Sequence, residues 1–138
     1  PAARDWCKKG PYTFLQGSHL GYLSAGVLVN RRLLSIGSRI HVIADEFYGA
    51  GTHVCGQVFH LNPAGRVELG EDGFLYRGAR AETAFYRLKP SEGGGAEGME
   101  LEETPVSFHY NQLEYAPCVS LWREAPLFVS MITVAAGY

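Results

Sequence analysis

The feature that most constrains the fold of this chain is its rhythm, because short apolar runs recur from end to end and almost every gap holds glycine, proline, asparagine or aspartate. These residues are typical of tight turns. No segment keeps the 3, 4, 7 apolar spacing of an amphipathic helix over ten or more residues. We therefore predict an all-β protein, an antiparallel β-sandwich of roughly nine to eleven strands.

The strand-like runs are separated by one stretch of a different kind. The runs lie at residues 11–16, 19–24, 26–37, 39–47, 53–61, 65–70, 73–78, 82–90, 99–110, 117–122 and 127–134. Between two of them, residues 91–98 read SEGGGAEG, which predicts a mobile loop. Since the pieces on either side are too short to bury separate cores, we predict a single β-sandwich domain over residues 1–138.

The charge balance argues against a nucleic-acid partner. The chain has 12 Lys and Arg against 14 Asp and Glu, a net charge of −2, whereas nucleic-acid-binding domains usually have a strongly basic face. The charge is uneven, with +4 over residues 1–90 and −6 over residues 91–138. No apolar run reaches the length of a membrane-spanning helix, so we predict no membrane partner.

Residues 39–63 hold three of the five histidines. Their pattern of strand, glycine-containing turn and strand predicts a hairpin in which Asp45 lies opposite Cys55 and diagonally across from His53. Two interpretations of the Asp45 and His53 pair stay open: a hydrogen bond that pins the turn, or a carboxylate that raises the basicity of a catalytic imidazole. Alternation places His53 and His60 on opposite faces, so this segment predicts no metal cluster.

Two further pairs of neighbouring residues are candidates, Arg31 and Arg32 for binding an anionic sugar and His109 and Tyr110 for acid–base chemistry. Neighbours on a strand point to opposite faces, so the two members of each pair do not act at one place on a regular strand. One of Arg31 and Arg32 can reach an anionic sugar, and the other is then exposed or paired elsewhere; the alternative is that both are ordinary arginines on the strand surface. His109 and Tyr110 act together only at a bulge or a strand end. Four aromatic residues are candidates for stacking on sugar rings or for the core: Trp6, Tyr12, Tyr22 and Trp122.

The chain shows no motif for a cofactor or a metal. It has no nucleophile elbow, no phosphate-binding glycine loop and no zinc-ligand spacing. Its three cysteines form no CxxC pair, and small buried thiols are the simplest interpretation of Cys7, Cys55 and Cys118. We therefore predict neither a cofactor nor a metal site.

Two segments resemble the carboxy-terminal β-domain of the heparinase II/III-like polysaccharide lyases. The first, NRRLLSIGSRIHVIADEFYGAGTHVCGQVFHLNP, has a basic pair, an apolar run that ends in Asp, a Gly-x-Gly-x-His turn and a Phe-His strand closed by Pro. These features fall on Arg31, Arg32, Asp45, Gly49, Gly51, His53, Phe59, His60 and Pro63. The second, VSFHYNQLEYAPCVSLWREAPLFVSMITV, is similar to the late segment of the family at Ser107, Tyr110, Ala116, Pro117, Pro126 and Phe128.

The resemblance implies a lyase that cleaves uronic-acid polysaccharides by β-elimination. That reaction needs a group that neutralises the uronate carboxylate, a base for the C5 proton and an acid for the leaving oxygen. In this family most of these groups come from an amino-terminal helical domain and an early His motif, neither of which this sequence shows. Two positions also depart from the family pattern: Asn30 stands where the family often has His, and Asn111 stands where the family has Gly. We therefore expect this domain to line the substrate cleft without a complete active site, and we assign no catalytic residue.

The resemblance also implies a binding site and partners. The candidate substrate-binding residues are Arg31, Arg32, His53, His60 and Tyr110. The expected partners are an anionic polysaccharide, glycosaminoglycan or alginate-like, and the missing amino-terminal helical domain, in a secreted or periplasmic protein. The alternative is a stand-alone, non-catalytic β-sandwich that binds carbohydrate or has a structural role.

Overall fold

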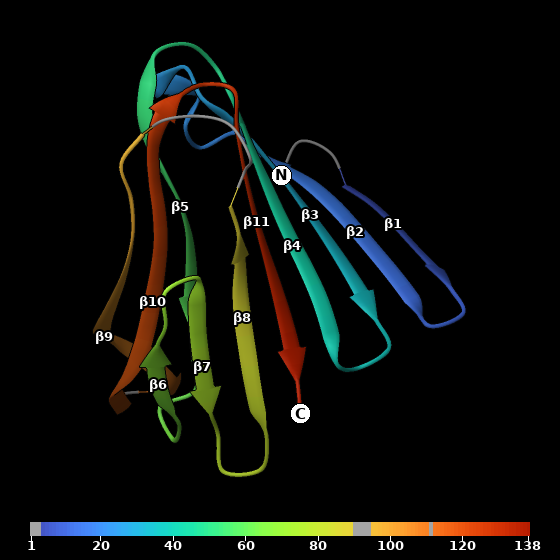
Figure 1. The fold of residues 1–138 in the computed structure, drawn as a ribbon, viewed down its shortest axis with the longest axis vertical. Coiled ribbons are helices and arrows are strands. Elements are labelled where there is room, and N and C mark those ends of the chain that lie inside the picture. Colours follow the sequence, from blue (N-terminus) through green and yellow to red (C-terminus); the bar gives the residue numbers. More distant parts are fainter. Residues whose placement is uncertain (1–3, 90–94, 111) are drawn as a thin grey trace.

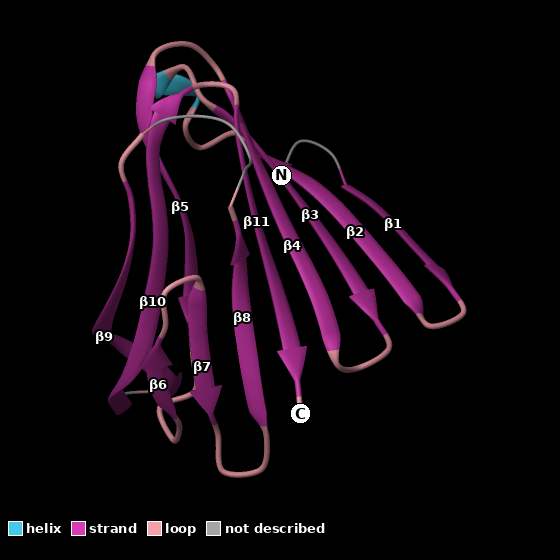
Figure 2. Cartoon of the chain, in the orientation of Figure 1, coloured by secondary structure: helices cyan, strands magenta, loops and turns pink. Residues whose placement is uncertain are grey.

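The computed structural model describes residues 4–89, 95–110 and 112–138, which form strands and one short 3-10 helix (Figure 2). In chain order the elements are β1 (Arg4–Lys9), β2 (Tyr12–His19), η1 (Leu23–Ala25), β3 (Leu28–Ile36), β4 (Ile40–Tyr48), β5 (Thr52–His60), β6 (Arg66–Leu69), β7 (Gly73–Arg77), β8 (Glu82–Leu88), β9 (Glu97–His109), β10 (Gln112–Pro126) and β11 (Val129–Gly137). Residues 91–94 of the glycine-rich segment predicted as a mobile loop, residues 91–98, lie outside the described residues, and its last two residues already belong to β9.

The strands form two antiparallel sheets (Figure 1). The larger has eight strands in the order β1-β2-β3-β4-β11-β8-β7-β6, and the smaller has three in the order β5-β10-β9. The carboxy-terminal strand β11 is inserted between β4 and β8. The predicted all-β sandwich is therefore confirmed.

Two local predictions differ from the structure near the amino terminus. The sequence RDWCKK forms the edge strand β1, which we did not predict because only Trp6 and Cys7 in it are apolar. Residues 19–24 were predicted as a strand, and this is wrong. Instead β2 ends at His19 and the chain turns through η1, where Gly26 has a φ of 72°, a conformation that glycine adopts without steric cost.

The small sheet packs over only part of the large one. The buried apolar cluster comes from the segment before β3 and from β4, β5, β7, β10 and β11: Val27, Phe47, Cys55, Phe74, Val119, Leu121, Ala125, Val129 and Met131. Among the described residues, β1 and β2 contribute no member to this cluster. We call β1, β2 and β3 the wing, because these strands extend beyond the region occupied by the small sheet (Figure 1).

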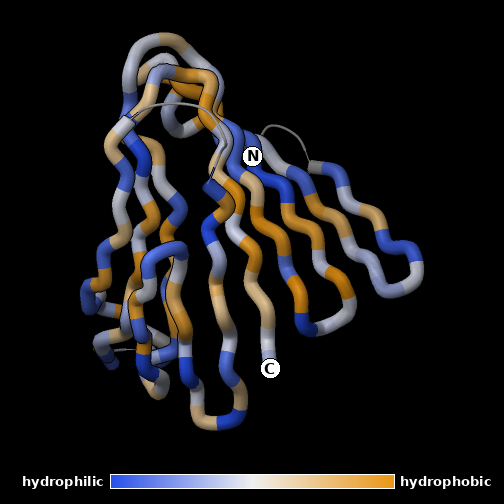
Figure 3. The backbone as a smooth tube through the Cα atoms, in the orientation of Figure 1, coloured by the Kyte–Doolittle hydropathy of each residue, from blue (hydrophilic) through white to orange (hydrophobic). Residues whose placement is uncertain are grey.

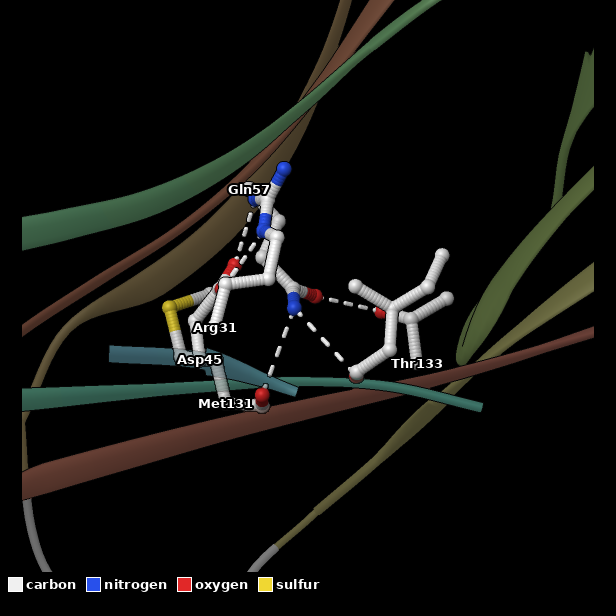
Figure 4. A network of polar contacts seen from close by, with 6 residues as sticks. Arg31, Asp45, Gln57, Met131 and Thr133 are labelled. Carbon is white, nitrogen blue, oxygen red and sulfur yellow. Dashed lines mark hydrogen bonds and ion pairs between the residues drawn. The ribbon is translucent and has the colours of Figure 1, made fainter. Parts of the chain in front are cut away.

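A buried polar network ties the two sheets together. Gln57 of β5 is 1% exposed and points into the sandwich. Its Nε2 donates to the carbonyl oxygens of Ile43 and Met131 at 3.4 Å and 3.3 Å, and its Oε1 accepts a hydrogen bond from Thr133 Oγ1 at 2.6 Å (Figure 4). Because a buried amide stabilises a fold only when its polar atoms are paired, this network fixes β5 over β4 and β11.

The outer face of the large sheet, which points away from the small sheet, carries an apolar band. Strand pairing places Phe14, Leu34, Val42, Val134 and Tyr86 side by side across β2, β3, β4, β11 and β8. Apolar colour recurs along these neighbouring strands (Figure 3). No described residue forms a second layer over this face. A sheet with apolar residues on both faces is typical of a domain that packs against a further layer.

Two of the three cysteines are buried as predicted. Cys55 and Cys118 are buried, whereas Cys7 lies exposed on the edge strand, so the prediction is wrong for that residue; all three are free thiols. Burial raises the pKa of Cys55, and burial together with the charge of Glu102 raises the pKa of Cys118. Both buried side chains therefore stay protonated at neutral pH and behave as small apolar residues.

Candidate functional site

A cleft of about 520 Å³ lies where the small sheet ends at β5 and the wing continues. Residues of β2, β3, β4 and β5 line it, together with the segment around η1. Its floor is largely apolar, and its polar side chains are His19, Tyr22, Arg31, Asp45 and His53. An apolar cleft with a few convergent polar groups is typical of a binding site for a small ligand or a chain segment.

The central polar feature of the cleft is the ion pair between Arg31 and Asp45. These residues are directly opposite each other on β3 and β4, and Arg31 donates through Nε to Asp45 Oδ1 and through Nη2 to Oδ2, both at 2.6 Å (Figure 4). The Asp45 side chain is 1% exposed, whereas that of Arg31 is 53% exposed. The hydrogen bonds to Asp45 raise the pKa of Arg31 above its ordinary value. The buried carboxylate therefore holds a permanently charged guanidinium at the wall of the cleft.

The prediction that the Gly-x-Gly-x-His turn closes a hairpin is wrong. Strand β4 pairs with β3 and β11, whereas β5 pairs with β10, so the turn carries the chain from one sheet to the other. A Cβ atom on Gly49 would lie 2.4 Å from the carbonyl oxygen of Gly26, and Gly51 has a φ of 84°. These two glycines allow the crossing to pack closely against the chain that follows η1.

The predicted contact between Asp45 and His53 is also wrong. Both carboxylate oxygens of Asp45 bond to Arg31, and His53 Nε2 lies 3.1 Å from the carbonyl oxygen of Ala50. Since β4 and β5 belong to different sheets, the register of a hairpin does not apply to them. His53 thus pins the turn through the backbone, and the carboxylate–imidazole pair of the catalytic interpretation does not form.

The structure brings together two of the five predicted substrate-binding residues, Arg31 and His53, which both line the cleft. Arg32 lies on the opposite face of β3, as alternation predicts, where it contacts Glu46. His60 is exposed on the outer face of the small sheet, and Tyr110 is 93% exposed in the turn between β9 and β10. The substrate-binding role of all five residues stays a prediction.

His19 is a cleft residue that the sequence did not suggest. Its ring lies 5.4 Å from that of Tyr22, centroid to centroid, and its Nδ1 accepts a hydrogen bond from the backbone N–H of Gly21 at 3.3 Å. Gly17 lies two residues before His19 on the same face of β2. It pairs with Arg31 and, having no side chain, leaves space beside the guanidinium in the cleft. Finding His19 from sequence requires the register between β2 and β3, which alternation alone does not specify.

A second cluster of charges lies on the outer face, around Glu46. This carboxylate accepts hydrogen bonds from Arg32 Nη1 at 2.6 Å, Tyr48 Oη at 2.9 Å and Asn30 Nδ2 at 3.2 Å. Burial acts to raise the pKa of Glu46, but these hydrogen bonds and the charge of Arg32 outweigh it and lower the pKa below 4.5. The charged form of Glu46 is therefore favoured by folding.

This lowered pKa predicts a dependence of stability on pH. The contribution of Glu46 is present above the pKa of the unfolded chain, near 4.5, and is lost as the pH falls through the lower folded-state pKa. Between pH 5 and about pH 3, the Glu46→Gln variant should lose less free energy of unfolding than the wild type. Urea unfolding followed by circular dichroism over this range checks the prediction, and equal losses in the two proteins would contradict it.

The part of the chain that the structure describes holds no cluster of three His, Cys, Asp or Glu residues able to bind a metal ion. In the same residues, no helix is both long and apolar enough to span a membrane. The polar groups that line the cleft are a fixed cation with its buried carboxylate, two imidazoles and a phenol, beside an apolar floor.

Comparison with known proteins identifies the family. The sequence profile described as "Heparinase II/III-like, C-terminal" matches residues 5–127, and the chain therefore belongs to this family. A mutant of the heparan sulfate lyase HepC from Pedobacter heparinus superposes with a TM-score of 0.83 at 14% identity, over 98% of this chain and 21% of that one. The heparinase III BT4657 gene product gives 0.76 at 16% identity, over 99% and 21%. The chain thus spans about a fifth of the length of these structures, and a search of curated proteins finds no match.

Proposed function

We propose that this domain forms one wall of the substrate cleft in a lyase that cleaves anionic, uronic-acid polysaccharides by β-elimination. The observation that carries the proposal is the half-exposed Arg31 guanidinium, held at the wall of the cleft by the buried Asp45. Arginine presents a planar fork of donors that fits carboxylate and sulfate oxygens. Structures of similar fold include one named as a heparan sulfate lyase and one named as heparinase III.

We infer that this cleft binds the anionic chain without carrying out the whole of the β-elimination. A base for the C5 proton must lie within hydrogen-bonding distance of it, and an acid must reach the leaving oxygen. His53 directs its Nε2 to the backbone of its own turn, and the Nδ1 of His19 accepts a hydrogen bond from the backbone N–H of Gly21. We infer that the base and the acid come from another part of a longer protein and that the role of Arg31 is to bind and orient the anionic chain.

The apolar band on the outer face of the large sheet supports a second part of the proposal. In a longer lyase this face packs against further polypeptide, for which the amino-terminal helical domain implied by the family resemblance is the candidate. Burial of Phe14, Leu34 and Val42 there would contribute roughly 25 cal/mol per Å² of apolar surface removed from water. A secreted or periplasmic location stays a prediction from the resemblance.

The proposal is tested by offering this chain heparan sulfate, alginate and, as an uncharged control, dextran. We expect titration calorimetry to show weak binding of the two anionic polymers that decreases with salt, no binding of dextran, and no increase in the absorbance of unsaturated uronate products. Arg31→Lys keeps a cation beside Asp45 but removes the fork of donors, so it should weaken binding by about tenfold. Arg32→Lys, on the opposite face, is the matched control.

Each alternative result has a separate meaning. Formation of unsaturated product by this chain alone would contradict the inference that its active site is incomplete. An equal effect of Arg31→Lys and Arg32→Lys would contradict binding at the cleft. If neither anionic polymer binds, the domain has a structural role, and the proposal of a polysaccharide cleft is wrong.

A further inference from the structure

We propose that the inner face of the wing is a second sugar subsite, in which Trp6 stacks on a pyranose ring and Lys8 binds the carboxylate or sulfate of the same chain. This inference rests on the proposed function, because it extends the polysaccharide cleft beyond Arg31. It assigns a role to the exposed edge of the large sheet, which contributes nothing to the buried core of the described residues.

The strand register places both residues on the same face as the cleft. Trp6 is opposite Leu15, which is opposite Leu33, and Gly17 of β2 is opposite Arg31 of β3. Since side chains alternate along each strand, Trp6 shares its face with Arg31. Neighbouring strands are separated by about 4.8 Å, so two strand spacings and a two-residue offset separate the Cα atoms of Trp6 and Arg31 by roughly 12 Å. That span is longer than the step between neighbouring sugar units, so only a chain longer than a disaccharide can reach both residues.

The exposure of Trp6 supports a role in ligand binding. The side chain is 71% exposed, and its cross-strand neighbour Leu15 is 48% exposed. Gly17, two residues along β2 from Leu15 and opposite Arg31, has no side chain and lines the cleft beside Arg31. A flat aromatic ring on an open sheet surface can stack on the apolar face of a sugar ring and be covered by it.

The charges of this face favour an anionic ligand. By strand alternation Lys8 lies on the same face as Trp6, two residues along β1, while the acidic Asp5 lies on the opposite face. On the inner face of β4 the acidic residue is Asp45, whose side chain is 1% exposed and is already bonded to Arg31. The accessible charge along this path is therefore positive, and it is complementary to a uronate or sulfated chain rather than to an acidic protein surface or a neutral one.

The experiment measures the affinity of the 138-residue chain for heparin-derived oligosaccharides of defined length, from disaccharide to hexasaccharide. The hexasaccharide should bind more tightly than the disaccharide because it reaches both Arg31 and Trp6. Trp6→Ala should weaken hexasaccharide binding by about tenfold and leave disaccharide binding unchanged. Lys8→Gln should weaken hexasaccharide binding and reduce its dependence on salt.

The same hairpin supplies matched controls on its other face. Tyr12 is 52% exposed on the outer face of β2, and Lys9 follows Lys8 on the outer face of β1. We expect Tyr12→Ala and Lys9→Gln to bind the hexasaccharide as the wild type does. The chain has two tryptophans, so a Trp122→Phe variant reports the fluorescence of Trp6 alone, which the hexasaccharide should protect from quenching by acrylamide.

Three results would overturn the subsite. If Trp6→Ala binds the hexasaccharide like the wild type while Arg31→Lys does not, the cleft is a polysaccharide site but the wing is not part of it. If Tyr12→Ala weakens binding as much as Trp6→Ala, or if the sugar leaves Trp6 open to acrylamide, ring stacking on the inner face is excluded. If no oligosaccharide binds at any length, the proposed function itself fails and this inference fails with it.

Discussion

Replacing Arg31 with methionine is expected to lower the free energy of unfolding by about 3 kcal/mol. Asp45 is 1% exposed, and both of its oxygens accept hydrogen bonds from Arg31. Without the guanidinium, a buried carboxylate is left with no compensating charge, which costs more than the net value of the pair itself. Urea unfolding at pH 7, monitored by circular dichroism, measures the change.

The neighbouring arginine is the control for this prediction. Arg32→Met removes the ion pair with Glu46, whose side chain is 14% exposed and keeps hydrogen bonds from Asn30 and Tyr48. The expected loss is about 1 kcal/mol or less, as for other ion pairs near the surface. Adding Asp45→Asn to Arg31→Met should restore part of the stability, since the unpaired charge is then removed. Equal losses for the two single arginine variants would refute the argument.

The Gln57→Leu variant should lose about 3 kcal/mol of stability, although leucine is apolar and similar in size. The substitution removes the acceptor for the Thr133 hydroxyl and the amide that donates to the carbonyl oxygens of Ile43 and Met131. Gln57 is 1% exposed and Thr133 is 0% exposed, so water does not replace the lost partners. Guanidinium unfolding at pH 7 measures the loss.

A double variant separates this loss of hydrogen bonds from a defect in packing. Replacing both members of a buried hydrogen-bonded pair with apolar residues of similar shape is nearly neutral for that pair. The double variant Gln57→Leu with Thr133→Val should therefore lose less free energy of unfolding than the sum of the two single losses. Strict additivity of the two losses would show that Gln57 and Thr133 are not energetically coupled, contrary to the structure.

The sequence by itself determined the class of fold and the face on which several side chains lie. The recurring strand pattern and the frequent turn residues predicted the sandwich, and alternation predicted that Arg31 and Arg32 point to opposite faces, as they do. The motif around Gly49 and Gly51 indicated the correct family. These features depend on residues close together in the chain, for which the period of a strand is a sufficient guide.

Only the tertiary structure decided which strands are partners. The turn at Gly49 and Gly51 fits a hairpin as well as a crossing between sheets, so Asp45 was assigned to His53 when its partner is Arg31, fourteen residues earlier on β3. His19 reaches the cleft because β2 pairs with β3 in one register, and β1 exists because it pairs with β2. Alternation tells which face a residue occupies, but the neighbour of a strand is chosen by the burial of whole apolar faces, which no local pattern encodes.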